Sequence, residues 1–258
     1  MASNIRSGLK NILESIGDQA AFFSSFIKNI FKSGFEWNEF GRQCYTIGYR
    51  SFGIVALTGF VLGFVLTLQS LPTLKQFGAS GFVPSMVSIS VVREIGPVIT
   101  ALICAGKVAS SIGAELGSMK VTEQIDSMEV SGANPVQYLV VTKILACFLM
   151  IPLLTMVADG MAFIGGFAGI NATSSMSAIL YFRKSFDGLD FSDLFPAVIK
   201  TFFFGLTIGF VGCYKGFNSN KGTASVGLAA NSAVVTASVW IIVIDAIAVQ
   251  LTSMLVYN

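Results

Sequence analysis

Five long apolar stretches follow one another along the 258-residue chain, and shorter polar segments separate them. The first, residues 51–74, contains no charged residue. As a helix rising about 1.5 Å per residue, it is long enough to cross about 30 Å of hydrocarbon. The other four carry between one and three charged residues each. The pattern therefore predicts five membrane-spanning helices, at residues 51–74, 84–114, 138–170, 194–214 and 229–256.

The first 45 residues have a different pattern, in which basic residues interrupt apolar ones at helical spacing. Ile5, Leu9 and Ile16 recur on one face, and Phe23 and Ile27 repeat the pattern further along. A secretory signal peptide would need an unbroken apolar core and a cleavage site of small residues, and this segment has neither. The pattern favours an amphipathic helix lying in the membrane surface, with its cations toward the lipid phosphates.

A polar, charge-bearing segment at residues 115–135 separates the second and third predicted spans. Within it we predict a short helix at residues 122–131, with Thr122 as N-cap and with Gly132 and Pro135 ending it. Its two faces differ, with Val121, Ile125 and Met128 on one and Glu123, Asp126 and Glu129 on the other. We expect this helix to dock on a soluble partner; the alternative is a solvated loop helix without one.

Composition supports a membrane protein and disfavours several other classes. Only 12% of the residues are charged, about half of the roughly 25% found in soluble domains. The basic residues are scattered, so they form no stripe for a nucleic-acid backbone, and no nucleic-acid partner is expected. The chain has no histidine and four widely spaced cysteines, a pattern that predicts no metal site. The sequence around Lys107 lacks the leading glycine and the hydroxyl of a nucleotide-binding loop, so energy must come from a gradient or a partner.

The distribution of lysine and arginine outside the predicted spans sets the orientation. With the N-terminus in the cytoplasm, segments 1–50, 115–143 and 215–225 are cytoplasmic and hold ten of these residues. The opposite loops hold three. The predicted helix at 122–131 then faces the cytoplasm.

Four pairs of glycines spaced four residues apart lie in or beside the predicted spans. Small residues at this spacing let helix backbones approach closely in lipid. We therefore predict a compact helix bundle in contact at Gly59/Gly63, Gly113/Gly117, Gly165/Gly169 and Gly205/Gly209.

Two adjacent residues of opposite charge, Arg93 and Glu94, lie inside the second span. A charge at membrane depth costs about 3 kcal/mol on insertion scales and marks a candidate functional site. The Gly96-Pro97 pair just after them predicts a break or kink. The two charges either line a cavity that receives a charged lipid headgroup or form an internal structural pair near the membrane surface.

Two further acids, Asp159 and Asp245, stand alone in apolar spans. They could relay protons. The more usual role of such acids is to accept hydrogen bonds from neighbouring groups and so hold helices together.

Residues 91–140, VVREIGPVITALICAGKVASSIGAELGSMKVTEQIDSMEVSGANPVQYLV, resemble the core signature of the MlaE/YrbE permeases. These are the membrane subunits of lipid-transporting ABC systems that work with MCE-domain proteins. The run ELGSMKVTEQIDSMEV, with the glycine and proline that follow it, is the most specific part of the match. Weaker similarity runs from the N-terminal helix through LTLQSL at 66–71 to IDAIAV at 244–249, so the resemblance covers nearly the whole chain.

The resemblance implies an all-α integral membrane protein in which residues 1–258 form a single permease domain. Its parts are a membrane-surface amphipathic helix region, two spans, a cytoplasmic coupling segment and three further spans, at 1–45, 46–114, 115–135 and 136–258. It also implies a homodimer in a bacterial inner membrane, with the N-terminus in the cytoplasm. Its partners would be a cytoplasmic ATPase, which binds ATP and Mg²⁺, and a periplasmic MCE-domain protein. Lipid would occupy a cavity between the two permeases.

The resemblance assigns residues to a lipid-binding site and to an ATPase-coupling site. By their position relative to the Arg-Glu-x-Gly-Pro motif, six residues are expected to bind lipid: Leu66, Gln69, Leu74, Phe77, Arg93 and Glu94. Four are expected to couple to the ATPase: Glu123, Gln124, Asp126 and Glu129. Phe77 stands where some relatives have an aromatic hydroxyl, and Lys107 where arginine is common, so the preferred headgroup stays open.

We therefore expect a permease subunit, without enzymatic activity of its own, of an ABC transporter that moves phospholipid or a related lipid to or from a periplasmic MCE partner. One alternative is a gradient-driven secondary transporter or proton-coupled channel that uses Glu94, Asp159 and Asp245. A lipid-modifying membrane enzyme is disfavoured, because the sequence has no histidine and no clustered acids, thiols or metal ligands. The lipid and the direction of transport are both open.

Overall fold

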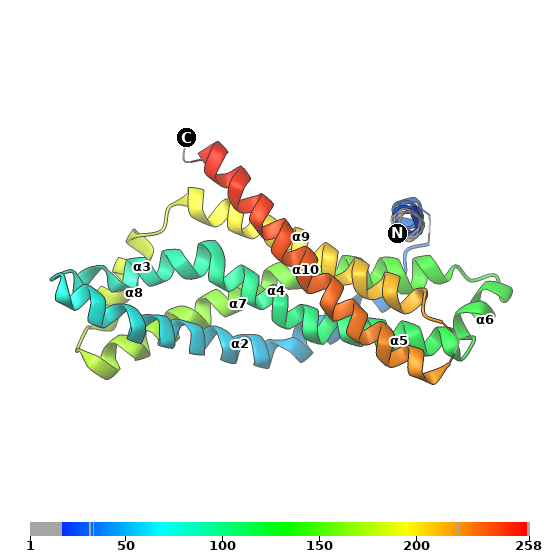
Figure 1. Cartoon of the computed structure of the whole chain (residues 1–258), viewed down its shortest axis with the longest axis horizontal. Coiled ribbons are helices and arrows are strands. Elements are labelled where there is room, and N and C mark those ends of the chain that lie inside the picture. Colours follow the sequence, from blue (N-terminus) through cyan, green and yellow to red (C-terminus); the bar gives the residue numbers. More distant parts are fainter. Residues whose placement is uncertain (1–16, 31, 33, 221, 257–258) are drawn as a thin grey trace, which may run out of the picture.

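The computed structural model of the chain (Figure 1) describes residues 17–30, 32, 34–220 and 222–256. Helices and short loops make up these residues, with no strand among them. Five helical segments are long and apolar enough to cross a membrane: Trp37–Gln76, Ser80–Val121, Val136–Thr173, Phe191–Phe217 and Thr223–Met254. The predicted all-α membrane fold with five spans is confirmed.

The second span is not one regular helix. After a 3₁₀ turn, η1 (Ser80–Phe82), it continues through α3 (Val83–Ser90), η2 (Val91–Ile95), α4 (Gly96–Cys104), η3 (Ala105–Ala109) and α5 (Ser110–Val121). The segments η2 and η3 are π-helical. Such turns carry hydrogen bonds from residue i to i+5 and occur frequently at functional sites.

The remaining spans are more regular. The first is α2 (Trp37–Gln76), the fourth is α9 (Phe191–Phe217) and the fifth is α10 (Thr223–Val256). The third begins with the π-helical η4 (Val136–Val141) and continues as α7 (Thr142–Thr173). Two short helices connect spans at opposite ends of the bundle, α6 (Gln124–Val130) and α8 (Ala178–Asp187).

Glycines bring α2 and α7 into direct backbone contact. A Cβ added at Gly63 would lie 1.9 Å from the carbonyl oxygen of Ala162, and one added at Gly165 would lie 1.9 Å from that of Phe60. Such distances leave room for hydrogen but not for a methyl group. All four predicted glycine pairs pack against another helix, so the prediction of a compact bundle is confirmed.

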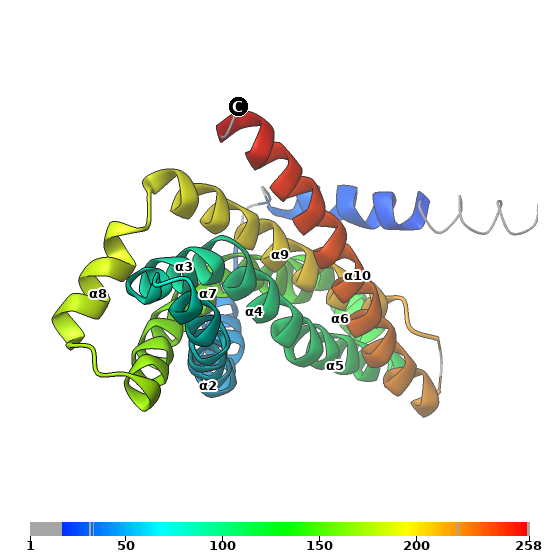
Figure 2. The same cartoon turned by 60° about the vertical axis from the view of Figure 1, so that its left-hand side comes forward.

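Residues 17–30 form a helix that runs across the bundle rather than along it (Figures 1 and 2). The Phe22 ring packs on Phe210 and Tyr214 of α9, with centroids 5.7 and 5.6 Å away. The side-chain amide of Asn134 donates a hydrogen bond of 2.6 Å to Asn29 and ties this helix to the loop after α6. The predicted N-terminal helix is confirmed over 17–30, residues 1–16 lie outside the described residues, and its place in the membrane surface stays a prediction.

The polar segment between the second and third spans is shorter than the stretch 115–135 predicted from its charged residues. Helix α5 continues to Val121 rather than ending near residue 114, because the run ELGSMKV is rich in strong helix formers. The predicted N-cap at Thr122 is wrong. The Thr122 hydroxyl donates to the carbonyl of Ser118 and closes α5, and Glu123, in the left-handed conformation with a φ of 58°, makes the turn into α6.

Candidate functional site

The π-helical turn η2 carries the adjacent Arg93 and Glu94. The sequence predicted a break or kink here; the chain stays helical, so there is no break, and its winding changes to a π-helical turn. Pro97 lies in the first turn of α4 and has no N–H to donate to the preceding turn. The Gly96 N–H donates to the carbonyl of Val91, which is the i to i−5 bond of the π-helical turn. The wider turn presents both charges toward the start of α9 and the end of α10.

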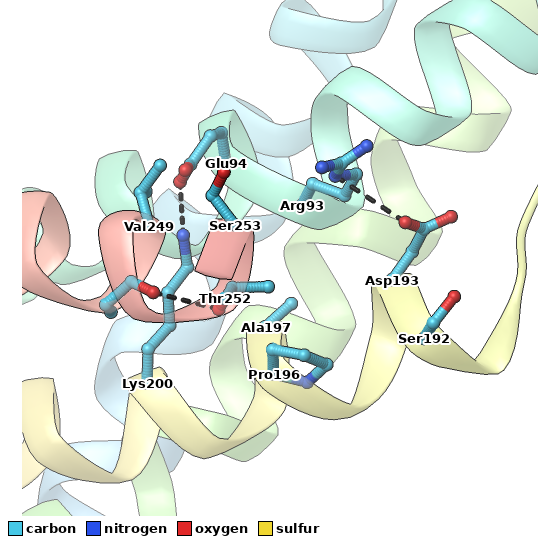
Figure 3. A pocket seen from close by; sticks show the side chains of 11 residues that line it. Arg93, Glu94, Ser192, Asp193, Pro196, Ala197, Lys200, Val249, Thr252 and Ser253 are labelled. Atoms are coloured by element: carbon cyan, nitrogen blue, oxygen red, sulfur yellow. Dashed lines mark hydrogen bonds and ion pairs between the residues drawn. The ribbon is translucent and has the colours of Figure 1, made fainter. Parts of the chain in front are cut away.

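Lys200 of α9 joins three helices. Its side chain is 6% exposed, and its ammonium donates one hydrogen bond to the Glu94 carboxylate and one of 3.0 Å to Asp245 of α10. A buried ammonium needs such partners, because desolvation of an unpaired charge costs several kcal/mol. Figure 3 shows Glu94 and Lys200 facing each other across the site. The pair joins α9 to α10, in line with the structural role considered for Asp245, although the donor is a lysine rather than a serine, a threonine or a backbone amide.

Arg93 faces Asp193 in the first turn of α9, with 3.6 Å between Nε and Oδ1 (Figure 3). Asp193 is buried, and its carboxylate also accepts the backbone N–H of Asp190 in a capping box that fixes the start of α9. We call Arg93, Glu94, Asp193, Lys200 and Asp245 the charged cluster. With all groups ionised it contains two cations and three carboxylates, a net charge of −1.

A cavity of about 340 Å³ opens beside this cluster, which we call the charged pocket. Four members of the cluster line it together with small and apolar residues of α9 and α10, among them Ala197, Val249 and Thr252. Charged groups of both signs next to an apolar wall suit an amphiphilic ligand that carries both a charge and a hydrocarbon portion.

The α2 residues predicted to bind lipid do not line the charged pocket within one chain. Leu66 and Leu74 are half-buried against an apolar cluster around Tyr181 of α8. Gln69 is exposed on α2, and Phe77, just beyond the end of α2, is 79% exposed. The structure thus divides the six predicted residues into two groups, and the role of the α2 group stays a prediction.

Asp159 of α7 lies against the start of α4. A Cβ added at Gly96 would be 1.9 Å from Asp159 Oδ1, so glycine is needed for this approach. The Oδ1 atom is buried and has no hydrogen-bond partner among the described residues. The expectation that neighbouring groups donate to Asp159 is therefore not met at this oxygen.

The predicted coupling helix has the two faces expected from its sequence. Ile125 is fully buried and Met128 packs against the main core, whereas Glu123, Gln124 and Glu129 are exposed. Asp126 instead forms an ion pair of 2.7 Å with Lys120 at the end of α5. An exposed row of polar side chains is thus held on an apolar anchor, a geometry that suits docking on a partner protein.

Two partners in these ion pairs were missed from the sequence, Asp193 and Lys200. A lysine inside an apolar span was the available signal, since it requires an acid from another span. Lys143 gave the same signal, and its buried ammonium is bound to Glu115 at 2.8 Å.

Comparison with known proteins bears directly on this arrangement. Residues 40–251, which include the charged cluster and α6, match the family model for the permease MlaE. The chain belongs to the MlaE permease family. It is 35% identical over 230 residues to a probable ABC transporter permease of Rickettsia typhi, which covers 89% of each chain. A probable ABC transporter permease of Synechocystis is 34% identical over 198 residues, 76% of this chain and 74% of the relative.

A third similar protein, a probable ABC transporter permease of Pyropia yezoensis, is 33% identical over 199 residues, 77% of this chain and 76% of the relative. The resemblance read from residues 91–140 is confirmed. This MlaE-family chain is a multi-pass membrane protein and a permease subunit of an ABC transporter.

Proposed function

We propose that this MlaE-family permease moves phospholipid between a bacterial inner membrane and a periplasmic MCE-domain partner, as a homodimer driven by a cytoplasmic ATPase. The observation that carries the proposal is the charged pocket, about 340 Å³ in volume, with ions of both signs beside an apolar wall. It lies where α9 begins and α10 ends, and α6 lies at the other end of the bundle (Figure 1). Lipid and ATPase would therefore act at opposite ends.

The charges of the pocket fit a zwitterionic headgroup. Arg93 would pair with the phosphate, because its side chain is 41% exposed and its guanidinium offers several donors, and the carboxylates would attract an amine. Leu66, Gln69, Leu74 and Phe77 would line the cavity between the two chains, where the acyl chains lie. Apolar walls hold hydrocarbon without hydrogen-bond requirements, so they would tolerate different acyl chains.

Coupling would run through α6. The ATPase would contact Glu123, Gln124 and Glu129. ATP and Mg²⁺ would bind to the ATPase and not to this chain. Ile125 is buried in the bundle, so a push on α6 would reach the helices around it. Since the third span begins at Val136, just after α6, closure of the ATPases would move α7 and reduce the cavity.

The lipid role is tested by native mass spectrometry of the gently extracted transporter. Arg93→Glu should reduce the bound phospholipid, since it replaces the phosphate partner with a like charge. Arg183→Glu, an equal reversal at an exposed residue of α8 outside the charged pocket, should retain it. Unchanged lipid in Arg93→Glu would remove this residue from the site.

The coupling role is tested by co-purification of the ATPase. The double variant Glu123→Lys/Glu129→Lys should release the ATPase, because both acids are exposed on α6. Asp187→Lys, a like reversal at the opposite end of the bundle, should retain it. An intact permease dimer that carries no ATPase even in the native protein would instead favour a gradient-driven transporter using Glu94, Asp159 and Asp245.

A further inference from the structure

A second cavity, of about 150 Å³, opens toward the α6 end of the bundle between α2 and the η3–α5 segment. Arg50 of α2 and Lys107 of η3 both line it. The Lys107 ammonium donates a hydrogen bond to the Arg50 carbonyl, which brings the two residues together. We call this the basic cavity.

The positive charges of the basic cavity are not neutralised by acids among the described residues. Neither Arg50 nor Lys107 forms an ion pair with an acid among the described residues. Glu115 is the acid that lines the cavity, and its carboxylate is bound to Lys143 at 2.8 Å. Two positive charges are left facing this space, in contrast to the net −1 of the charged cluster. The cavity therefore favours an anion.

A buried hydroxyl gives independent evidence for a ligand. Ser51 lines the basic cavity and is 1% exposed, and its Oγ has no hydrogen-bond partner among the described residues. Buried polar atoms are nearly always paired, so an unpaired one calls for a partner that is not part of the chain. An oxygen of a bound anion would accept this hydrogen bond.

The surroundings favour an anion that is part of a lipid. The uncharged stretch of the first span begins at Ser51, so we expect the cavity to lie at the boundary between water and hydrocarbon. Phe52 and Ile54, next along α2, are about half exposed and present an apolar surface to acyl chains. A phosphate at this level with hydrocarbon beside it is the arrangement of a phospholipid in a bilayer.

We propose that the basic cavity binds the phosphodiester of an anionic phospholipid, at a site separate from the charged pocket. Arg50 would hold two phosphate oxygens through its planar guanidinium, Lys107 would act as a point charge, and the Ser51 hydroxyl would donate the third contact. In the orientation expected from the distribution of basic residues, this lipid lies in the cytoplasmic leaflet.

The test is a lipid titration of the delipidated full-length protein, followed by native mass spectrometry. Phosphatidylglycerol should bind more tightly than phosphatidylcholine with the same acyl chains. Arg50→Gln and Lys107→Gln should each weaken phosphatidylglycerol about tenfold, as expected for the loss of a charge-assisted contact. Lys215→Gln, which removes a cation of α9 that does not line the cavity, should leave it unchanged.

Ser51→Ala gives a second readout that does not depend on charge. It should weaken phosphatidylglycerol severalfold without lowering the unfolding temperature of the lipid-free protein, since that hydroxyl has no partner there. The titration is repeated in Arg93→Glu, which separates this site from the charged pocket. Equal binding of the two lipids, or full phosphatidylglycerol binding in the Arg50 and Lys107 variants, would overturn the proposal. Displacement by glycerol 3-phosphate at matched concentration would assign the site to a soluble phosphate and overturn the lipid assignment.

Discussion

Gly63→Ala would place a methyl group between α2 and α7, where the structure has no space for one. The new Cβ would lie 1.9, 2.6 and 2.8 Å from the oxygen, carbonyl carbon and Cα of Ala162. All three are backbone atoms, so no side-chain rotation relieves the overlap. The helices would have to separate by about 1 Å, and the contacts along both would weaken with distance.

The expected cost combines two opposing effects. Overpacking of a close-packed interface costs about 1–3 kcal/mol, and a backbone clash belongs at the upper end of that range. Alanine in place of glycine regains about 1 kcal/mol of helix propensity. The net destabilisation is therefore about 2 kcal/mol. For a chain of this size that lowers the unfolding temperature by about 4–8 °C.

A thiol-reactive fluorogenic dye can follow this unfolding, because Cys104, Cys147 and Cys213 are free and fully buried until the bundle opens. Gly53→Ala is the matched control on the same helix, since a Cβ there meets no atom within 4 Å. It should melt at or above the native temperature. An unfolding temperature of Gly63→Ala equal to that of Gly53→Ala would refute the close approach of α2 and α7.

Three further substitutions test the buried charges and the turn before α6. Lys200→Met should destabilise the protein by about 3 kcal/mol in the same thermal assay, which is the low end of the cost of breaking a buried ion pair because Glu94 is 41% exposed. The double variant Lys200→Met/Asp245→Asn should recover part of the lost stability. Lys143→Met should lower the unfolding temperature by less than Lys200→Met does. It leaves one carboxylate without its partner, that of Glu115, which is 44% exposed, whereas Lys200→Met leaves two. An equal loss would contradict this ranking. Glu123→Gly should preserve or raise the unfolding temperature, whereas Glu123→Val should destabilise the protein by about 1 kcal/mol and so lower that temperature, since the left-handed φ of 58° strains a branched side chain. The reverse order would contradict the turn geometry.

Hydropathy was sufficient to place the spans, because an uninterrupted apolar stretch in a membrane protein has few structural options. It was not sufficient to predict the residues at which the helices end. Helix α5 extends beyond the apolar block to Val121, since helical hydrogen bonding does not stop where hydrophobicity does. The start of α6 was misplaced for the same reason, because Thr122 resembles an N-cap in sequence whether it begins one helix or closes another.

The charged cluster could be only partly foreseen. Adjacent opposite charges within a span made Arg93 and Glu94 stand out in the sequence. Their partners lie about one hundred residues away, since Lys200 is 106 positions from Glu94, and such a pairing is fixed only when the helices pack. The grouping of Leu66 and Leu74 with α8 rather than with the charged pocket likewise depends on packing within one chain.

The π-helical turns in the second span also constrain how this chain can change over time. A π-helical turn holds one more residue than an α-helical turn, so it takes up that residue without rotating the helix that follows. Removing one residue from Val91–Ile95 would restore ordinary α-helical winding and leave the direction of α4 and α5 nearly unchanged, so Asp159 would still meet Gly96. The loss would fall on the charged cluster, because the wider turn that presents Arg93 and Glu94 would be gone. Relatives that use the same charged cluster should therefore keep the length of this segment.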